Sequence, residues 1–268
     1  MAGERSKYYL EDPELGELTK ELFRQYVGIQ GDEEIVQHIK AIRDKAWQLF
    51  NYPCIGGFSF VEMQIHGHPL ANEVFARMKT GKETLLDLGC CFAQDIRSLV
   101  FEGAPSDKMT GFDLRSDFVE FGYDLFRDRK TLKSEFVFGD FFEECGLKVG
   151  SFDIIHASAF FHLFNWEEQV EAVTKAIRLL KPKKDSLILG RQAGSPTADS
   201  YPHPTSRSGE MFRHDPESFD KLVNEVARRT GMQLKAESAF VGHQYGGLKY
   251  KELEREGFRV IQFSIRMV

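Results

Sequence analysis

The sequence is short of the residues that build metal sites and disulfide frameworks. Only four of its 268 residues are cysteines, at positions 54, 90, 91 and 145. They show no C-x-x-C spacing, and no histidine tract lies beside them, so the usual pattern of a zinc site is missing. Neither a bound metal nor a set of disulfides is therefore expected.

Long apolar runs and an excess of positive charge are also missing. No stretch of about 18 apolar residues is available to span a bilayer, and residues 1–14 carry no apolar signal-peptide core. The formal charge of −6 argues against a polyanionic partner, because nucleic-acid-binding proteins normally carry a basic stripe. We expect a globular, cytoplasmic protein with no nucleic-acid partner and no stable membrane insertion.

Glycine is sparse in the stretch around which the rest of the chain is organised, residues 84–95, TLLDLGCCFAQD. An apolar run of strand length contains Asp87 near its end, and the chain turns at Gly89 before a helical pattern begins. A pyrophosphate-binding turn would need G-x-G-x-x-G, so a nicotinamide-dependent oxidoreductase is not favoured. Asp87 could instead hold a cationic ligand, and free backbone N–H groups at the turn suit a nucleotide-like one. A buried turn without a ligand is the alternative.

Aromatic residues, in contrast, are abundant. The chain has 24 phenylalanines, with clusters within residues 138–142 and 160–164. Core packing is the default explanation for such residues, although a large apolar substrate pocket would use the same side chains.

The first 80 residues or so are predicted to be helical and separate from the rest of the chain. Asp12 and Pro13 have the pattern of a helix cap followed by proline at the first helical position, with apolar residues at helical spacing until Gly28. A second, amphipathic helix is predicted over residues 32–49. Because the remaining chain could form a sheet domain by itself, we expect these helices to act as a lid over the substrate.

The segment 51–69 lies between these helices and the predicted sheet. It contains paired glycines, aromatic residues and the histidines His66 and His68. An H-x-H pair could be half of a metal site, but no acidic or cysteine partner is near in sequence. We therefore interpret the segment as a surface or pocket-lining loop.

From Gly81 onward, strand-like runs alternate with helical ones, which is typical of a parallel α/β sheet. The predicted strands are 83–88, 108–113, 134–138, 152–157, 185–190, 233–242 and 258–267, and the predicted helices are 92–103, 115–128, 166–180 and 216–230. No helix separates the last two strands, so they are predicted to form an antiparallel pair. The segment 191–214 is predicted to be a long loop on the ligand side of the sheet, where Arg191 or His203 could pair with a substrate acid.

Acidic residues stand at three successive strand ends, where open α/β sheets bind their ligands. The residues concerned are Asp87 and Gly89, then Asp113 and Leu114, then Gly139, Asp140 and Phe141. Asp113 follows Gly89 by 24 residues, a spacing at which an acid can bind both hydroxyls of a ribose. Asp140 could accept a hydrogen bond from an adenine amino group, and the Phe141 backbone with neighbouring apolar side chains could hold the ring. The pattern predicts a nucleoside-binding rim.

These motifs resemble a known family. The order D-L-G-C-C-F-A, G-F-D-L, F-G-D-F-F and F-D-I-I-H-A-S-A-F-F-H resembles class I S-adenosylmethionine-dependent methyltransferases over residues 80–268. The segments YYLEDPELGELTKEL, YPCIG, HLFNW and RHDPESFD resemble, over nearly the whole chain, methyltransferases of fungal meroterpenoid biosynthesis. The family turn usually has glycine at its third position, where this chain has Ala93.

The resemblance implies an α/β, Rossmann-like, mostly parallel sheet with an antiparallel C-terminal strand. Residues 1–80 would form a helical lid and residues 81–268 the methyltransferase core. S-adenosylmethionine would be the cofactor, bound by Asp87, Gly89, Cys90, Asp113, Leu114, Gly139, Asp140, Phe141, His156 and Ala157. No metal is expected. A homodimer is possible.

Several members of the family methylate the carboxyl group of a farnesylated aromatic acid, so the resemblance implies an apolar small-molecule substrate. A carboxylate nucleophile needs no base, whereas a phenol or a carbon nucleophile would be helped by one. His162 is the first candidate for a catalytic residue, with His156 second, and the alternative for His162 is a histidine that only packs or orients substrate. Two other functions stay open: methylation of a phenol or carbon, and a cyclase or binding module that transfers no methyl group.

Overall fold

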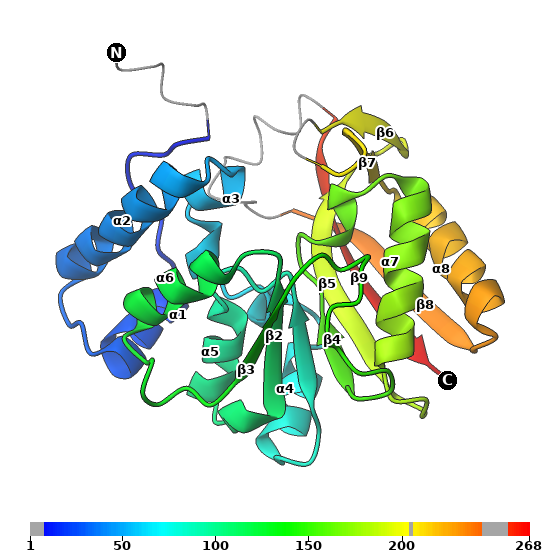
Figure 1. The fold of residues 1–268 in the computed structure, drawn as a ribbon. Helices are drawn as coiled ribbons and strands as arrows, with labels where there is room; N and C mark the ends of the chain where they lie inside the picture. Colours follow the sequence, from blue (N-terminus) through cyan, green and yellow to red (C-terminus); the bar gives the residue numbers. More distant parts are fainter. Residues whose placement is uncertain (1–7, 204–205, 243–256) are drawn as a thin grey trace.

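A computed structural model describes residues 8–203, 206–242 and 257–268. Its centre is a seven-stranded sheet in the order β3-β2-β1-β4-β5-β9-β8 (Figure 1). The strands are β1 Leu85–Leu88, β2 Met109–Asp113, β3 Glu135–Phe138, β4 Ile154–His156, β5 Leu187–Gly194, β8 Leu234–Val241 and β9 Arg259–Met267. Strands β1 to β5 are parallel to one another, while β9 runs antiparallel to both β5 and β8. The predicted sheet, with its antiparallel final pair, is confirmed.

Burial follows the role of each strand in the sheet. All four residues of β1 and all three of β4 are buried, as expected for parallel strands covered on both faces. In β8 half-buried and exposed residues alternate over most of the strand, because α8 packs against one of its faces. β5 continues to Gly194, beyond its predicted end at residue 190, because β9 pairs with it along its whole length.

The helices of the core are α4 Ala71–Lys79, α5 Gln94–Phe101, α6 Ser116–Phe126, α7 Trp166–Leu179 and α8 Pro216–Thr230. α7 begins with a capping box in which Asn165 and Glu168 bond reciprocally, and α8 begins with a similar box formed by Asp215 and Ser218. α8 ends at Gly231, which has a φ of 70°. These predicted starts and the predicted stop are confirmed, and α7 and α8 lie side by side near the β8 end of the sheet (Figure 1).

The N-terminal region contains α1 Glu17–Leu22, a π-helical turn η1 Phe23–Val27, α2 Asp32–Leu49 and the short α3 Pro53–Gly56. The predicted second helix is confirmed, but the predicted start of the first helix at Asp12 and Pro13 is wrong. Asp12 does not cap a helix, since its carboxylate accepts a hydrogen bond from Lys40 Nζ at 2.6 Å. A tertiary contact has replaced the local cap.

The segment 51–69, predicted as a loop, contains α3 and two single 3₁₀ turns, η2 Ser59–Val61 and η3 Ile65–Gly67. Its two histidines serve different contacts. His68 Nε2 bonds to the carbonyl oxygen of Phe263 at 3.0 Å, while the His66 ring lies 4.6 Å from the ring of Phe75. Within the described ranges, no three His, Cys, Asp or Glu residues are grouped so that they could hold a metal ion.

The N-terminal helices share a hydrophobic cluster with the core. The ring of Phe23 lies 5.7 Å from that of Phe126, and Tyr26 Oη donates a hydrogen bond to Asp128 at 2.8 Å. Asp128 in turn forms a fully buried ion pair with Arg97 at 2.7 Å. These helices are therefore anchored to α6 and to the loop after it.

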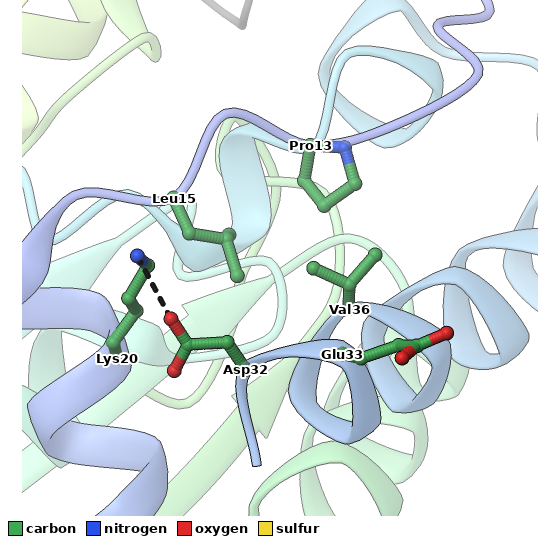
Figure 2. Close-up of a pocket in the computed structure, with 6 residues that line it drawn as sticks. All are labelled: Pro13, Leu15, Lys20, Asp32, Glu33 and Val36. Atoms are coloured by element: carbon green, nitrogen blue, oxygen red, sulfur yellow. Dashed lines mark ion pairs between the residues drawn. The ribbon is translucent and has the colours of Figure 1, made fainter.

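A hollow of about 360 Å³ lies on the outside of this region (Figure 2). Its wall includes the ion pair between Lys20 and Asp32, whose atoms are 3.1 Å apart. The other lining residues are Pro13, Leu15, Glu33 and Val36. Since it includes no residue of a strand end, this hollow is not part of the nucleoside-binding rim.

The prediction of an irregular loop over residues 191–214 is wrong. After the end of β5, the chain forms an antiparallel hairpin of β6 Asp199–Pro202 and β7 Glu210–Arg213. These short strands show no clear apolar alternation, and their pairing is supported from outside, because Phe212 N donates to Phe164 O at 2.9 Å. Residues 204–205 lie outside the described part. None of the helices in the described part of the chain is long and apolar enough to cross a bilayer.

Candidate functional site

The turn after β1 is held against the end of β2. The N–H groups of Gly89 and Cys90 both donate to the carbonyl oxygen of Phe112, at 2.8 and 2.9 Å. Gly89 has a φ of 76°, and a Cβ atom there would lie 2.7 Å from the ring of Phe160. Ala93 adopts a φ of 53°, a conformation that costs an L-residue roughly 1–2 kcal/mol. Alanine at position 93, where the family usually has glycine, is therefore tolerated at the cost of a strained backbone conformation.

Asp113 connects this turn to the end of β2. Its Oδ2 accepts a hydrogen bond from Cys91 N at 2.8 Å, and its Oδ1 accepts one from Arg115 N at 3.0 Å. Burial raises the pKa of Asp113 to about 6, because it outweighs the stabilisation by these N–H groups. The carboxyl group is thus already fixed in orientation at the position predicted to bind ribose.

The end of β3 completes the predicted rim. Gly139 N donates to Asp113 O at 3.2 Å, and Asp140 Oδ1 accepts from Phe142 N at 2.9 Å. Asp140 is exposed and pairs with Arg207 at 3.2 Å. Because β1, β2 and β3 are adjacent and parallel, Asp87, Asp113 and Asp140 lie at one edge of the sheet.

The two apolar residues predicted at this rim differ in exposure. Leu114 is exposed, so its side chain is open to a ligand. Phe141 is buried between Phe112 and Phe160, with ring centroids 5.6 and 5.5 Å away. The ring of Phe141 therefore packs in the core beneath the strand ends and is not open to a ligand.

A chain of hydrogen bonds connects the ends of β1 and β4. Asp87 Oδ1 bonds to His156 Nδ1 at 2.8 Å, and His156 Nε2 bonds to Ser158 Oγ at 2.7 Å. Burial opposes a charge on His156, but the carboxylates of Asp95 and Asp87 prevail and raise its pKa. Ser158 Oγ also accepts from Arg191 N at 3.2 Å. These hydrogen bonds therefore connect Asp87, just before the turn after β1, to β5.

The comparisons with known proteins are consistent with this geometry. Residues 8–61 match a family described as the meroterpenoid methyltransferase N-terminal domain, and residues 85–183 match a methyltransferase domain. The O-methyltransferase atr3 of Stereocaulon alpinum is 39% identical over 262 residues, which cover 96% of this chain and 75% of that one. The chain belongs to the fungal meroterpenoid methyltransferase family.

Two further relatives are also named as methyltransferases. The O-methyltransferase phiE of Fungal sp. (strain ATCC 74256) is 42% identical over 75% of this chain and 68% of that one. The Asnovolin E/Chermesin D methyltransferase nvfJ of Aspergillus novofumigatus is 37% identical over 83% of this chain and 81% of its own. The methyltransferase described here acts in meroterpenoid biosynthesis and uses S-adenosylmethionine.

Solved structures agree on the fold. A Haemonchus contortus phosphoethanolamine N-methyltransferase 2, in complex with phosphomonomethylethanolamine and S-adenosylhomocysteine, has a TM-score of 0.55 at 14% identity, covering 84% of this chain and 59% of that one. The [4+2]-cyclase SpnF has a TM-score of 0.50 at 16% identity, covering 74% and 81%. At these identities the likeness concerns the fold of the methyltransferase alone.

The residues at the rim fit the predicted cofactor. Asp87 Oδ2 and Gln94 Oε1 are buried, and neither has a hydrogen-bond partner among the described residues. Such acceptors are costly unless a donor reaches them, and the ammonium group of S-adenosylmethionine is a donor of the required charge. The roles of the individual residues in cofactor binding stay predictions, including those of Cys90 and Ala157, whose backbone N–H groups bond to Phe112 O and Leu189 O.

His162 lies on the short 3₁₀ turn η5 Phe161–Leu163, between β4 and α7. Its burial, reinforced by His203 and Arg213 nearby, lowers its pKa to about 3. The β6–β7 hairpin covers this turn, since Gln169 of α7 bonds to both Phe164 O and Phe212 O. His162 is therefore a neutral, enclosed imidazole at neutral pH.

Sequence reasoning missed Asp95, Gln94 and Ser158. Asp95 accepts a hydrogen bond from Ile65 N at 2.9 Å, and burial raises its pKa to about 6. In sequence, Asp95 and Gln94 have the pattern of ordinary residues of a first helical turn. In the fold, Asp95 raises the pKa of His156, and Gln94 Nε2 donates to Asp95 Oδ2 at 3.3 Å, a grouping that the local sequence does not indicate.

Proposed function

We propose that this methyltransferase transfers the sulfonium methyl group to a carboxylate oxygen of a prenylated aromatic acid. The carboxylate oxygen forms a bond to the methyl carbon, the carbon–sulfur bond breaks, and its electron pair goes to sulfur. S-adenosylmethionine supplies the activated methyl group when it is bound at the strand ends. The chain itself has to align the acid, shield it from water and leave its oxygen ionised.

The observation that supports a carboxylate is the state of His162. A phenol has a pKa near 10, whereas the pKa of His162 is about 3, so proton transfer between them is uphill by on the order of 10 kcal/mol. A carboxylic acid is already ionised at neutral pH and needs no base. His162 is consequently suited to orient the substrate, with its imidazole kept neutral by burial.

A base-assisted reaction on a phenol is the second candidate, and the hydrogen-bond chain from Asp87 to Ser158 favours it. His156 has a raised pKa, which makes it a better proton acceptor than His162. Both ring nitrogens of His156 already take part in hydrogen bonds, to Asp87 and Ser158. A phenol proton would have to travel through Ser158 Oγ.

The test compares His162→Gln with His156→Gln, using 3-farnesylorsellinic acid and S-adenosylmethionine. Mass spectrometry and NMR locate the added methyl group on the carboxyl or a phenolic oxygen. For carboxyl transfer, His162→Gln loses about tenfold in kcat, roughly 1.4 kcal/mol of positioning, with no change in the pH profile. A phenolic methyl ether as the product, with a loss of 10²-fold or more in His156→Gln, would establish the second candidate instead.

A further inference from the structure

A cavity of about 540 Å³ is lined by residues of the N-terminal region together with Arg191 of β5 and Gly242, which follows β8. Its volume is within the range of small-molecule sites, which is about 300–1,000 Å³. The apolar part of the wall includes Pro13, Phe58, Val61 and Met63, and its charged residues are Glu14, Glu62 and Arg191. The cavity therefore suits a ligand with an apolar body and one charged group.

The cationic group of the wall is the guanidinium of Arg191, which is fixed by hydrogen bonds. Arg191 Nη2 pairs with Glu62 Oε2 at 2.7 Å, and Arg191 Nε donates to Gln64 Oε1 at 3.0 Å. The side chain of Arg191 is only 12% exposed, whereas that of Glu62 is 27% exposed. A guanidinium carries five N–H donors in a planar fork, so these two bonds leave capacity for a second carboxylate.

The backbone of Arg191 connects the cavity to the cofactor edge. Its N–H donates to Ser158 Oγ at 3.2 Å, and its carbonyl oxygen accepts from Ala159 N at 2.7 Å. Ser158 belongs to the chain of hydrogen bonds that runs through His156 to Asp87, just before the turn after β1. The backbone of Arg191 therefore lies next to Ser158, at the edge of the sheet where the methyl donor is predicted to bind.

We infer that Arg191 recognises the carboxylate of the substrate and that Glu62 is its resident counter-ion, to which it returns after the reaction. This inference rests on the proposed function. The incoming acid shares or replaces the pair with Glu62, and its apolar part occupies the wall formed by Phe58, Val61 and Met63. Methyl transfer converts the carboxylate into a neutral ester, so the product loses its charge-assisted bonds while Glu62 keeps its own. The ion pair therefore discriminates acid from ester and favours release of the product.

The experiment measures the affinity of 3-farnesylorsellinic acid and of its methyl ester by calorimetry, on protein saturated with S-adenosylhomocysteine. The wild type should bind the acid at least tenfold more tightly than the ester. Arg191→Gln should abolish that preference, with the affinity for S-adenosylhomocysteine unchanged within twofold. Arg191→Lys should retain part of the preference, because it keeps the charge without the planar fork.

Two further variants separate recognition from structure. Glu62→Gln should bind the acid as tightly as the wild type or more tightly, since the competing carboxylate is gone. Arg228→Gln, which removes an equal charge from the exposed face of α8, should leave the preference unchanged. Retained preference in Arg191→Gln would overturn the inference, and so would equal losses of acid binding in Arg191→Gln and Glu62→Gln, which would make the pair a structural latch.

Failure of the proposed function gives a different result. If the product is a phenolic methyl ether, the site of methylation has been misassigned, while the acid-over-ester preference still reports on Arg191. If the ester is the product but Arg191→Gln keeps the preference, only the role of Arg191 is wrong.

Discussion

At the scale of single residues, two of the carboxyl groups predicted to bind the cofactor, those of Asp87 and Asp113, are buried. Asp113 is held by the N–H groups of Cys91 and Arg115, so the predicted binding of two ribose hydroxyls would need little reorganisation. Asp87 is buried beside His156 and leaves one oxygen without a partner among the described residues. Such preorganisation lowers the cost of ordering the site when the cofactor binds.

Replacing Asp113 by Ala should weaken binding of S-adenosylmethionine by roughly 1–3 kcal/mol, the usual cost of losing a charge-assisted hydrogen bond. Asp140→Ala should cost less, because Asp140 is exposed and paired with Arg207. Calorimetric titration of both variants gives the comparison. An unchanged affinity in Asp113→Ala would remove Asp113 from the ribose site.

The affinity for the cofactor should depend on pH below about 6. The pKa of Asp113 is raised to about 6 in the free protein, whereas ribose hydroxyls favour its ionised form and lower that pKa. The protein must therefore release a proton to bind, and affinity falls by up to tenfold for each pH unit below 6.

Asp95 also has a pKa of about 6, so the titration needs both variants. Asp113→Asn should flatten the dependence on pH, and Asp95→Asn should leave most of it. The opposite result would assign the pH dependence of cofactor affinity to Asp95. Calorimetric titration with S-adenosylmethionine between pH 5 and pH 8 measures this dependence.

At the scale of elements, the turn after β1, which contains Phe92, is in direct contact with α6. A Cβ atom on Gly122 of α6 would lie 2.5 Å from the carbonyl oxygen of Phe92, which already accepts a hydrogen bond from Arg97 Nη1 at 2.7 Å. Glycine is therefore required within this helix by its neighbour.

Gly122→Ala should destabilise the protein by about 1–3 kcal/mol, since overpacking against backbone exceeds the gain of roughly 0.5–1 kcal/mol in helix propensity. Urea unfolding measures the change, and the affinity for S-adenosylmethionine should fall with it. Gly31→Ala, at the N-cap of α2, is a control for added volume without overpacking, because a Cβ there would lie 3.7 Å from the Glu34 Cβ atom. A stabilised Gly122→Ala protein would mean that Phe92 moves freely.

Elements governed by their own residues could be predicted from the sequence. The strands of the main sheet follow from apolar runs, and α7 and α8 follow from capping residues that act within four positions of each other. Elements governed by distant residues could not. Asp12 accepts a hydrogen bond from Lys40 and does not cap a helix. The β6–β7 hairpin depends on bonds to Phe164 and Gln169.

The candidate site divides in the same way. The acids at the strand ends were found because a strand end is a local feature. The bond from Asp87 to His156 spans 69 residues and the one from Glu62 to Arg191 spans 129, so neither has a signal in local sequence. The state of His162 was also beyond prediction, because its burial is produced by a hairpin that the sequence did not indicate.

At the scale of the whole molecule, the N-terminal region is both a wall of the substrate cavity and a part of the hydrophobic core. Pro13, Phe58 and Val61 line the cavity, while Phe23, Ile39 and other residues pack with Phe92 and Phe126. Its role as a lid stays a prediction, and any movement would have to preserve this shared cluster.

Deleting residues 1–30 should abolish turnover and reduce solubility, because the deletion removes the cavity wall at Pro13 and uncovers Phe126. Activity assays and light scattering measure the two effects. Tyr26→Phe is the milder companion: loss of its hydrogen bond to the buried Asp128 should cost roughly 1.5–3 kcal/mol of stability with cofactor affinity unchanged. A fully active truncated protein would reject the lid.

The position of β9 has a consequence for biosynthesis on the ribosome. β8 is translated before β9, yet in the described sheet it is joined to β5 only through β9. Until residues 259–267 emerge, the nascent chain carries unpaired edges on both β5 and β8, and such edges invite association with other chains. We expect dependence on chaperones to be greatest at this stage of translation, and premature stop codons between α8 and β9 to yield aggregating rather than merely inactive protein.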